Sequence, residues 1–258
     1  MKRINTFLTI LFISLLSSPS WSETIDDLVE RNGIYYKKFT DVPFTGKVTG
    51  DEQGSLNNGK REGVWVDYHK NGQLRNKENY KNGVYDGEWV SYYSNGQVSD
   101  KVNWKNGEKD GDSVSYWNNG HLYYEGNYKN GELDGAWVWY YKNGDLQYDG
   151  NYKNGEKDGA WVTYHENGQL WDKGNWKNGE LDGAWVTYWN NGQLWNKGNW
   201  KNGEKDGDWV WYYGNGQLRN KGNYKNDKKE GPFVNYNEDG TVDQKWTGTY
   251  KNGAKISY

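Results

Sequence analysis

The stretch Asp158–Lys177 reads DGAWVTYHENGQLWDKGNWK and contains most of a unit that recurs along the chain. Glycines in the phase of Gly159 follow one another at intervals of 24 residues, and each is followed five residues later by a tyrosine in the phase of Tyr164. The glycines are Gly63, Gly87, Gly111, Gly135, Gly159, Gly183, Gly207 and Gly231. A fixed period of this size is the signature of a repeat protein whose units stack on their neighbours.

Each unit is predicted to form a β-hairpin. Trp161–Tyr164 and Leu170–Trp176 have the aromatic, β-branched and alternating character of strands. Asn167-Gly168 lies between them, and Asn-Gly is the strongest signal for a two-residue hairpin turn. Since successive hairpins can continue one sheet, we predict an all-β fold: an elongated single-layer antiparallel sheet of stacked 24-residue hairpins.

A two-residue turn fixes the register of this hairpin. Tyr164 then faces Trp171, and Trp161 faces Gly174, where its ring shields the bare backbone of the strand glycine. Asp158 and Gly159 are assigned to a turn between units. The register predicts a packed face with Trp161, Leu170, Gly174 and Trp176, and an opposite face with Val162, Tyr164, Trp171 and Lys173.

The composition suits a thin sheet better than a thick core. The chain has 35 Gly, 17 Trp and 23 Tyr, but only 5 Phe and 1 Met, and its mean hydropathy is −1.22. Disordered chains are poor in aromatic residues, so this aromatic content at fixed spacing argues against disorder. There is no cysteine, which excludes a disulfide framework.

Residues 1–22 are predicted to be a signal peptide. Lys2 and Arg3 precede the mostly apolar run Ile4–Leu16, and Ser20-Trp21-Ser22 fits a cleavage site. We expect an exported protein, periplasmic or extracellular, with no membrane span after signal removal, because no other run approaches the ~20 apolar residues of a span. The mature chain would carry a net charge of −5, with both signs interspersed, which speaks against nucleic acid as a partner.

The remaining chain divides by repeat phase. Residues 23–60 are predicted to form an N-terminal cap with a degenerate repeat, in which Glu23–Arg31 forms a short helix over the first edge. Residues 61–228 hold seven regular repeats. Residues 229–258 hold the last repeat and a C-terminal cap, because the phase shifts by two residues between Gly240 and Gly248.

The unit resembles a known repeat. Tyr148–Gly155 (YDGNYKNG), followed by Gly159, is similar to the MORN repeat, and Asp-Gly-x-Trp-x-x-Tyr-x-x-Asn-Gly-Gln-Leu resembles its bacterial variant. Proteins of this variant are labelled antitoxin components of the YwqK family. The resemblance covers about residues 44–254. It implies an elongated, twisted single-layer sheet, scaffolding and protein contacts, and, from the antitoxin label, neutralisation of a toxin inside the cell.

Catalytic and metal sites are not predicted. Asp158, Asp182 and Asp206 recur in every unit, as turn-forming Asp before Gly does for structural reasons. His69 and His165 lie four units apart, about 38 Å at ~4.8 Å per strand, too far to share an ion. Asn202–Gly207 mimics the start of a calcium loop, but Tyr213 stands where the loop needs a bidentate Glu. We expect no enzyme and no cofactor.

The aromatic surface is the remaining candidate site. Rows of Trp and Tyr beside Asn, Gln and Lys suit stacking on a sugar or anchoring of a protein. We predict a non-enzymatic exported scaffold that binds an unidentified protein or cell-envelope partner; the alternatives are a carbohydrate-binding module that binds an envelope glycan and an antitoxin-like neutraliser. Rings that vary between units, with their neighbouring tyrosines, give the predicted binding residues Trp139, Tyr164, Trp171, Tyr188, Trp189, Trp195 and Trp211.

Overall fold

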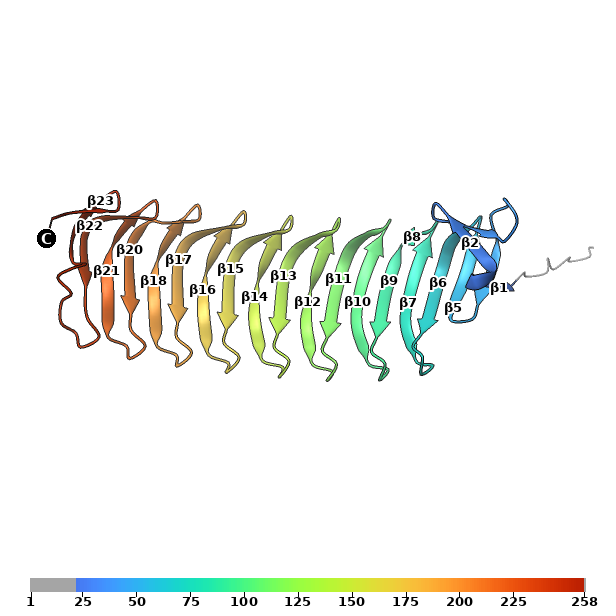
Figure 1. The fold of residues 1–258 in the computed structure, drawn as a ribbon, viewed down its shortest axis with the longest axis horizontal. Coiled ribbons are helices and arrows are strands. Elements are labelled where there is room, and N and C mark those ends of the chain that lie inside the picture. Colours follow the sequence, from blue (N-terminus) through green and yellow to red (C-terminus); the bar gives the residue numbers. More distant parts are fainter. Residues whose placement is uncertain (1–21, 258) are drawn as a thin grey trace, which may run out of the picture.

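The computed structural model describes residues 22–257, so the predicted signal peptide lies outside the described residues except for Ser22. Within this part, 22 strands form one sheet and two more form a small separate sheet. From β4 onward the strands pair antiparallel with their neighbours in sequence, so the described residues form an elongated array with β1 near one end and β23 near the other (Figure 1). The predicted fold class is confirmed. No helix in residues 22–257 is long and apolar enough to cross a membrane.

The elements are β1 (Ser22–Thr24), η1 (Ile25–Asp27), β2 (Leu28–Arg31), β3 (Ile34–Lys37), β4 (Gly46–Thr49), β5 (Glu52–Asn57), β6 (Lys60–Tyr68), β7 (Leu74–Lys81), β8 (Val84–Tyr85), β9 (Gly87–Tyr92), β10 (Val98–Lys105), β11 (Glu108–Tyr116), β12 (Leu122–Lys129), β13 (Glu132–Tyr140), β14 (Leu146–Lys153), β15 (Glu156–Tyr164), β16 (Leu170–Lys177), β17 (Glu180–Tyr188), β18 (Leu194–Lys201), β19 (Glu204–Lys205), β20 (Gly207–Tyr212), β21 (Leu218–Lys225), β22 (Lys228–Asn235), β23 (Gly248–Lys251) and β24 (Ala254–Ser257).

The turn at Asn167-Gly168 is longer than predicted. The amide of Gly168 donates to the carbonyl of His165, and the amide of His165 donates to Gln169, which leaves a three-residue loop closed by a left-handed glycine. Tyr164 therefore pairs with Leu170, and the predicted pairing of Tyr164 with Trp171 is wrong. Trp171 is the extra residue of a β-bulge, beyond which the predicted pair Trp161–Gly174 is restored.

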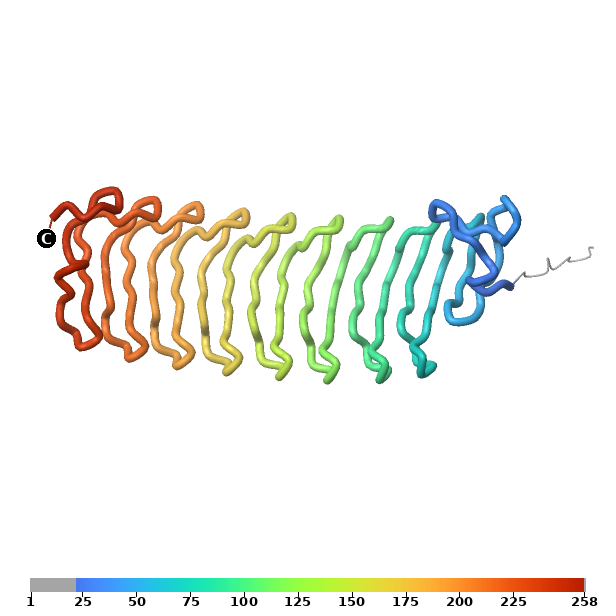
Figure 2. Tube along the Cα trace, viewed as in Figure 1, coloured from blue at the N-terminus to red at the C-terminus, as the bar shows by residue number. Residues whose placement is uncertain are grey.

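The two-residue turn lies at the other end of each unit. Lys177 pairs with Glu180, and Asn178 and Gly179 have φ values of 48° and 78°, as a type I′ turn requires. Asp158-Gly159 is not a turn between units, as we predicted, but lies inside β15. Gly159, at φ 92°, forms a bulge against β14 and pairs regularly with Trp176 of β16. The two kinds of turn form two rows along the array (Figure 2).

The corrected register defines two faces of the sheet. Trp161, Thr163, Asp172, Gly174 and Trp176 lie on one side, which we name the ring face, because cross-strand partners share a side. Val162, Tyr164 and Lys173 lie on the other side, which we name the valine face. Leu170 pairs with Tyr164 and belongs to the valine face, so its predicted place on the packed face is wrong.

On the ring face, the ring in the phase of Trp161 covers a glycine of the preceding unit in most units. Trp161 pairs with Gly150 and with Gly174, but its ring lies on Gly150, where an added Cβ would stand 2.3 Å from the ring. The predicted cover of Gly174 belongs instead to Trp185. Trp161 is only 3 % exposed, and its indole N–H donates to the carbonyl of Asn151. The ring thus fastens two consecutive units together.

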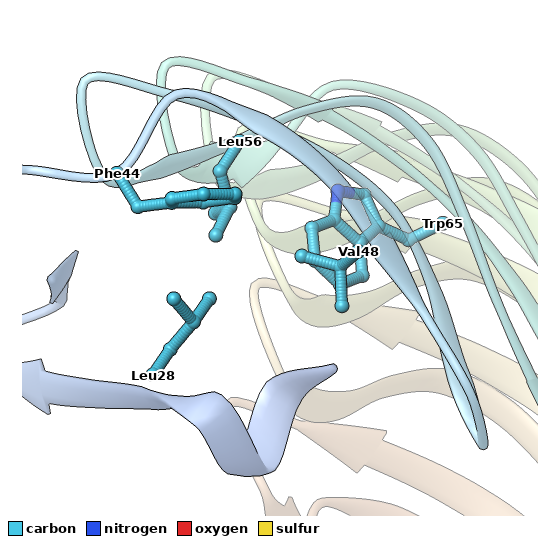
Figure 3. Close-up of a cluster of buried hydrophobic side chains, with 5 residues drawn as sticks. All are labelled: Leu28, Phe44, Val48, Leu56 and Trp65. Carbon is cyan, nitrogen blue, oxygen red and sulfur yellow. The ribbon is translucent and has the colours of Figure 1, made fainter. Parts of the chain in front are cut away.

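The N-terminal cap is built from strands instead of the predicted helix. Only η1, a single 3-10 turn, interrupts β1 and β2. β1 pairs parallel with β4 and covers the first edge of the sheet. Leu28, at the start of β2, faces Phe44, Val48 and Leu56 and completes a buried cluster with Trp65 (Figure 3). At the opposite end, β23 and β24 form the last hairpin, with Phe233 paired to Gly248.

Candidate functional site

A row of side chains stands at the bulged hairpin ends, one per unit. We name it the bulge row; its members are Arg75, Ser99, Tyr123, Gln147, Trp171, Trp195 and Arg219. The bulge removes each of these residues from the strand ladder, so the backbone does not require any particular side chain there. The chemistry of the row varies widely from unit to unit on an otherwise repeated frame.

Each bulge residue lies beside the first residue after the preceding strand. These neighbours, which we name the anchor row, are His69, Tyr93, Trp117, Tyr141, His165, Trp189 and Tyr213. Ring contacts between the two rows have centroid distances of 4.2 Å for Trp117–Tyr123, 5.6 Å for His165–Trp171 and 4.9 Å for Trp189–Trp195. The Arg219 guanidinium lies 5.7 Å from the centre of the Tyr213 ring.

The anchor row also has a structural role. In six units its polar ring atom lies within hydrogen-bond distance of a backbone carbonyl 23 residues further along the chain. Tyr141 Oη, for example, donates to the carbonyl of Tyr164 at 2.8 Å. Trp189 is the exception: its indole N–H is buried and has no hydrogen-bond partner among the described residues, and the same holds for Trp195.

The structure does not gather the seven predicted binding residues into one surface. Trp171 and Trp195 lie in the bulge row and Trp189 in the anchor row, while Tyr164 and Tyr188 lie on the valine face. Trp139 and Trp211 lie on the ring face, stacked on Trp137 and Trp209 at 5.2 and 5.3 Å. Trp171 is the most available of the rings, with 43 % of its surface exposed.

The predicted binding residues include Trp171 and Trp195 of the bulge row and Trp189 of the anchor row, but not the residues at the same positions in the other units. Trp117 and Tyr123 form the closest ring contact between the two rows, and neither was among the predicted binders; Tyr213 and Arg219 were also missed. The signal was present in the sequence, because a three-residue loop at each Asn-Gly places these residues side by side. The assumption of a two-residue turn concealed it.

The ring face is largely filled by the chain itself. Lys157 Nζ lies 4.1 Å from the centre of the Trp161 ring and 4.7 Å from that of Trp176, a cation–π arrangement. Burial lowers the pKa of Lys157 and raises the pKa of the Asp172 carboxyl. Lys205 lies similarly near Trp200 and Trp209, and Lys229 near Phe233. These cations are already held by rings, which leaves the ring face a packing surface.

A polar cluster on the ring face surrounds Glu78, in the place that glycine occupies in most other units. Its carboxylate accepts hydrogen bonds from Tyr80 Oη at 2.8 Å, Tyr85 Oη at 3.3 Å and Trp89 Nε1 at 3.2 Å. Arg61 Nη1 lies 3.6 Å away. Burial raises the pKa of both tyrosines. The carboxylate is thus satisfied internally, as expected of a structural network.

No group of three metal-ligating side chains occurs within residues 22–257. His69 and His165 each hold a carbonyl of the next unit through Nε2, and His121 Nδ1 lies 3.1 Å from the carbonyl of Lys142. The recurring acids likewise serve the frame: Asp182 Oδ2 accepts from the amide of Asn202 in the next turn. The chemistry that the surface offers is therefore stacking and hydrogen bonding along the bulge row.

A stacked array of this kind, in which the turn and strand positions repeat and the bulge row varies, is a repeat scaffold. The model of the MORN repeat variant family matches seven consecutive segments, residues 61–82, 85–106, 109–130, 133–154, 157–178, 181–202 and 205–226. The chain belongs to this family, whose members are generally protein-binding scaffolds without enzymatic activity. None of the curated proteins compared matches the chain, so the resemblance to antitoxin components stays a prediction.

Proposed function

We propose that this protein is a non-enzymatic, exported MORN-repeat scaffold that binds a protein partner along its bulge row. The observation that carries the proposal is the β-bulge itself. It presents one side chain per unit outside the strand ladder, and these side chains differ where the frame repeats. Tyr, Trp and Arg fill five of the seven positions, and these residue types dominate binding energy in protein interfaces.

The arrangement of the row also favours an extended partner. Bulge residues recur at every second strand, which at ~4.8 Å per strand is a spacing of about 10 Å. A row of seven such positions is therefore some 60 Å long. The bulge-row rings Tyr123, Trp171 and Trp195 each contact a ring of the anchor row, so an extended segment could place successive side chains between them. We place the centre of the binding surface at Trp171 and Trp195.

The test compares partner capture by matched variants. Trp171→Ser with Trp195→Ser introduces the residue that Ser99 already supplies at this position, and the circular dichroism spectrum of the variant should confirm that the sheet is kept. Gln147→Ser is the control in the same row. In cross-linking from the native cells, we expect the partner to be lost with the double tryptophan variant and kept with the control. Capture that is undiminished by the tryptophan variant would show that the row is not the binding surface.

The same variants separate the alternative functions. Quenching of tryptophan fluorescence by a soluble envelope glycan, lost in the Trp171→Ser, Trp195→Ser variant, would favour the carbohydrate-binding module. A captured partner that proves toxic to cells, and is neutralised by residues 23–258, would favour the antitoxin. Export has its own test: the mature protein from native cells should begin at Glu23, and an intact residue 1 would contradict a cleaved signal.

A further inference from the structure

One unit of the array lacks the ring that its neighbours carry on the ring face. In the phase of Trp161 this unit has Ser113, on β11, which pairs with Val102 of β10. Where the preceding strand has a glycine, the ring lies over that glycine, as Trp161 lies on Gly150. A valine side chain is much smaller than an indole, so Val102 replaces only part of the volume of the missing ring.

A hollow of about 390 Å³ lies beside Val102. Val102 itself is 4 % exposed, and the other side chains that line the hollow include Trp89, Asp100, Trp104, Lys109 and Tyr124. This volume falls within the range of roughly 300–1,000 Å³ that is usual for small-ligand sites. The walls combine aromatic rings with charged groups, as such sites commonly do.

Lys109, the cation of this unit, is without the ring that its counterparts contact. In four other units the cation of this phase lies over the ring four residues later. The distances from the cationic group to the ring centre are 4.3 Å for Arg61–Trp65, 4.1 Å for Lys157–Trp161, 5.1 Å for Lys205–Trp209 and 4.2 Å for Lys229–Phe233. Among the described residues Lys109 lies only near the flanking rings, Trp104 at 5.9 Å and Tyr128 at 4.8 Å.

The sheet also keeps the hydrogen-bond acceptor of the missing ring. In four units the indole N–H donates to the backbone carbonyl ten residues earlier. These bonds are Trp65 to Ser55 at 3.1 Å, Trp137 to Asn127 at 3.0 Å, Trp161 to Asn151 at 3.2 Å and Trp209 to Asn199 at 3.0 Å. The equivalent acceptor for residue 113 is the carbonyl of Asn103, next to Val102. Within residues 22–257 no side chain donates to it, and the buried Ser113 hydroxyl has no partner.

We infer that the hollow beside Val102 binds an indole ring brought by a ligand, in the place of the missing side chain. The ring packs on Val102, its face lies under the Lys109 ammonium, and its N–H donates to the Asn103 carbonyl. A small indole compound and a tryptophan side chain of another protein share this chemistry, and the test separates them. The hollow lies on the ring face, away from the bulge row, so the inference does not rest on the proposed function.

The test is fluorine NMR of the probe 5-fluoroindole, because the 17 tryptophans of the chain would obscure a change in protein fluorescence. We expect the wild-type chain to broaden the probe signal with a Kd in the millimolar range, since so small a ligand makes few contacts. The blocking variant is Val102→Gly with Ser113→Trp, which restores the glycine–tryptophan pair of other units and should weaken binding at least tenfold. Lys109→Met removes the cation without filling the hollow and should weaken binding about threefold.

Thr163→Trp is the matched control. It adds an indole to the ring face in the phase of Trp139 and Trp211, away from the hollow, and should leave binding unchanged. Circular dichroism checks that each variant keeps its sheet, and Lys109→Met decides the question if the blocking variant does not fold. A wild-type chain that leaves the probe signal unchanged up to the solubility limit would overturn the inference. So would undiminished binding in the folded blocking variant or in Lys109→Met, or a loss of binding in the control.

Competition against the bound probe identifies the source of the ring. A Gly-Trp-Gly peptide that displaces the probe at lower concentration than free indole would assign the site to a tryptophan side chain of a partner protein. The opposite order would assign it to a small indole compound. If neither competitor displaces the probe, the indole ring is not what the hollow recognises, and the inference is wrong.

Discussion

The two halves of the array fill the space between adjacent strands of the ring face with different side chains. From β12 onward a glycine lies under a ring of the next unit, in the pairs Gly126–Trp137, Gly150–Trp161, Gly174–Trp185, Gly198–Trp209 and Gly222–Phe233. In the first two regular units the glycine is replaced by Glu78 and Val102. Val102 is buried, and its partner Ser113 is only 2 % exposed. In this unit the glycine is replaced by a larger residue, Val102, and the tryptophan paired with it is replaced by a smaller one, Ser113.

This difference shows what the position requires. The requirement is a filled volume shared between two adjacent strands, and either strand can supply it. Gly with Trp and Val with Ser are two divisions of the same space. At Glu78 the ring of Trp89 is kept, and it donates to the carboxylate instead of lying on bare backbone. Two consecutive units therefore replace the bare glycine, one by the polar contacts of Glu78 and one by the apolar side chain of Val102, whereas Gly54 at the start of the sheet again lies under a ring, that of Trp65.

The prediction with the largest expected effect converts a glycine–tryptophan pair of the C-terminal half into the valine–serine pair found in the N-terminal half. Gly150→Val alone forces a side chain into the Trp161 ring and should cost at least about 3 kcal/mol, while Trp161→Ser alone should cost about 3–5 kcal/mol. The double variant recreates the Val102–Ser113 pair and should recover about 2–3 kcal/mol of the sum. Urea unfolding monitored by circular dichroism measures all three. Strictly additive losses would mean that the two positions do not share volume.

A second test removes the carboxylate at the centre of the Glu78 cluster. Glu78→Gln leaves one acceptor for three donors and removes the charge beside Arg61, so we expect a loss of about 2 kcal/mol in unfolding free energy. Glu52→Gln is the matched control, since Glu52 binds the same arginine at 2.6 Å from a more exposed position. Its loss should be smaller, and equal losses would argue against a special role of Glu78.

The prediction with the smallest expected effect compares Asp172 and Asp100, two aspartates at equivalent positions of different units. Burial raises the pKa of the Asp172 carboxyl, so its ionisation opposes folding, and the contribution of Asp172 to the free energy of unfolding should decline as pH rises from 3.8 through the raised pKa. Asp172→Asn should remove this decline and gain less than about 1 kcal/mol at pH 7. In the N-terminal half, Asp100 accepts from Ser91 at 3.0 Å and Ser115 at 2.7 Å, so Asp100→Asn should lose stability instead. Thermal unfolding from pH 3 to 7 distinguishes the two signs.

The sequence predicted the sheet because the period places the strands. The pair Trp161–Gly174 was predicted from a turn of the wrong length, since the three-residue loop shifts the pairing by one residue and the bulge at Trp171 shifts it back. The two Asn-Gly turns of each unit look alike locally. Asn178 occupies the left-handed region, whereas the side-chain amide of Asn167 donates to the carbonyl of Asn190 in the next unit. Only the stacking of units distinguishes them.

The direction of the ring cover was also beyond sequence reasoning. Trp161 has a glycine on each side, and the choice of Gly150 depends on the side-chain rotamer in the assembled sheet. Variation between units identified Trp171 and Trp195 as candidate binders, because variation is visible in the sequence. It did not reveal that Trp139 and Trp211 lie on the ring face, since their phase is that of ordinary packing residues such as Thr163.

The contacts between units give this molecule an adjustable length. The contacts that fasten neighbouring units, such as Trp161 on Gly150, Tyr141 to the carbonyl of Tyr164, and Asn167 to the carbonyl of Asn190, join positions less than one period apart. None of them depends on how many units the array contains. Adding or deleting 24 residues would give every remaining group a partner of the same kind and would change the distance between the two caps by about 10 Å. The number of units thus determines the distance between the two ends of the sheet, and with it the separation of any partners that the two ends contact.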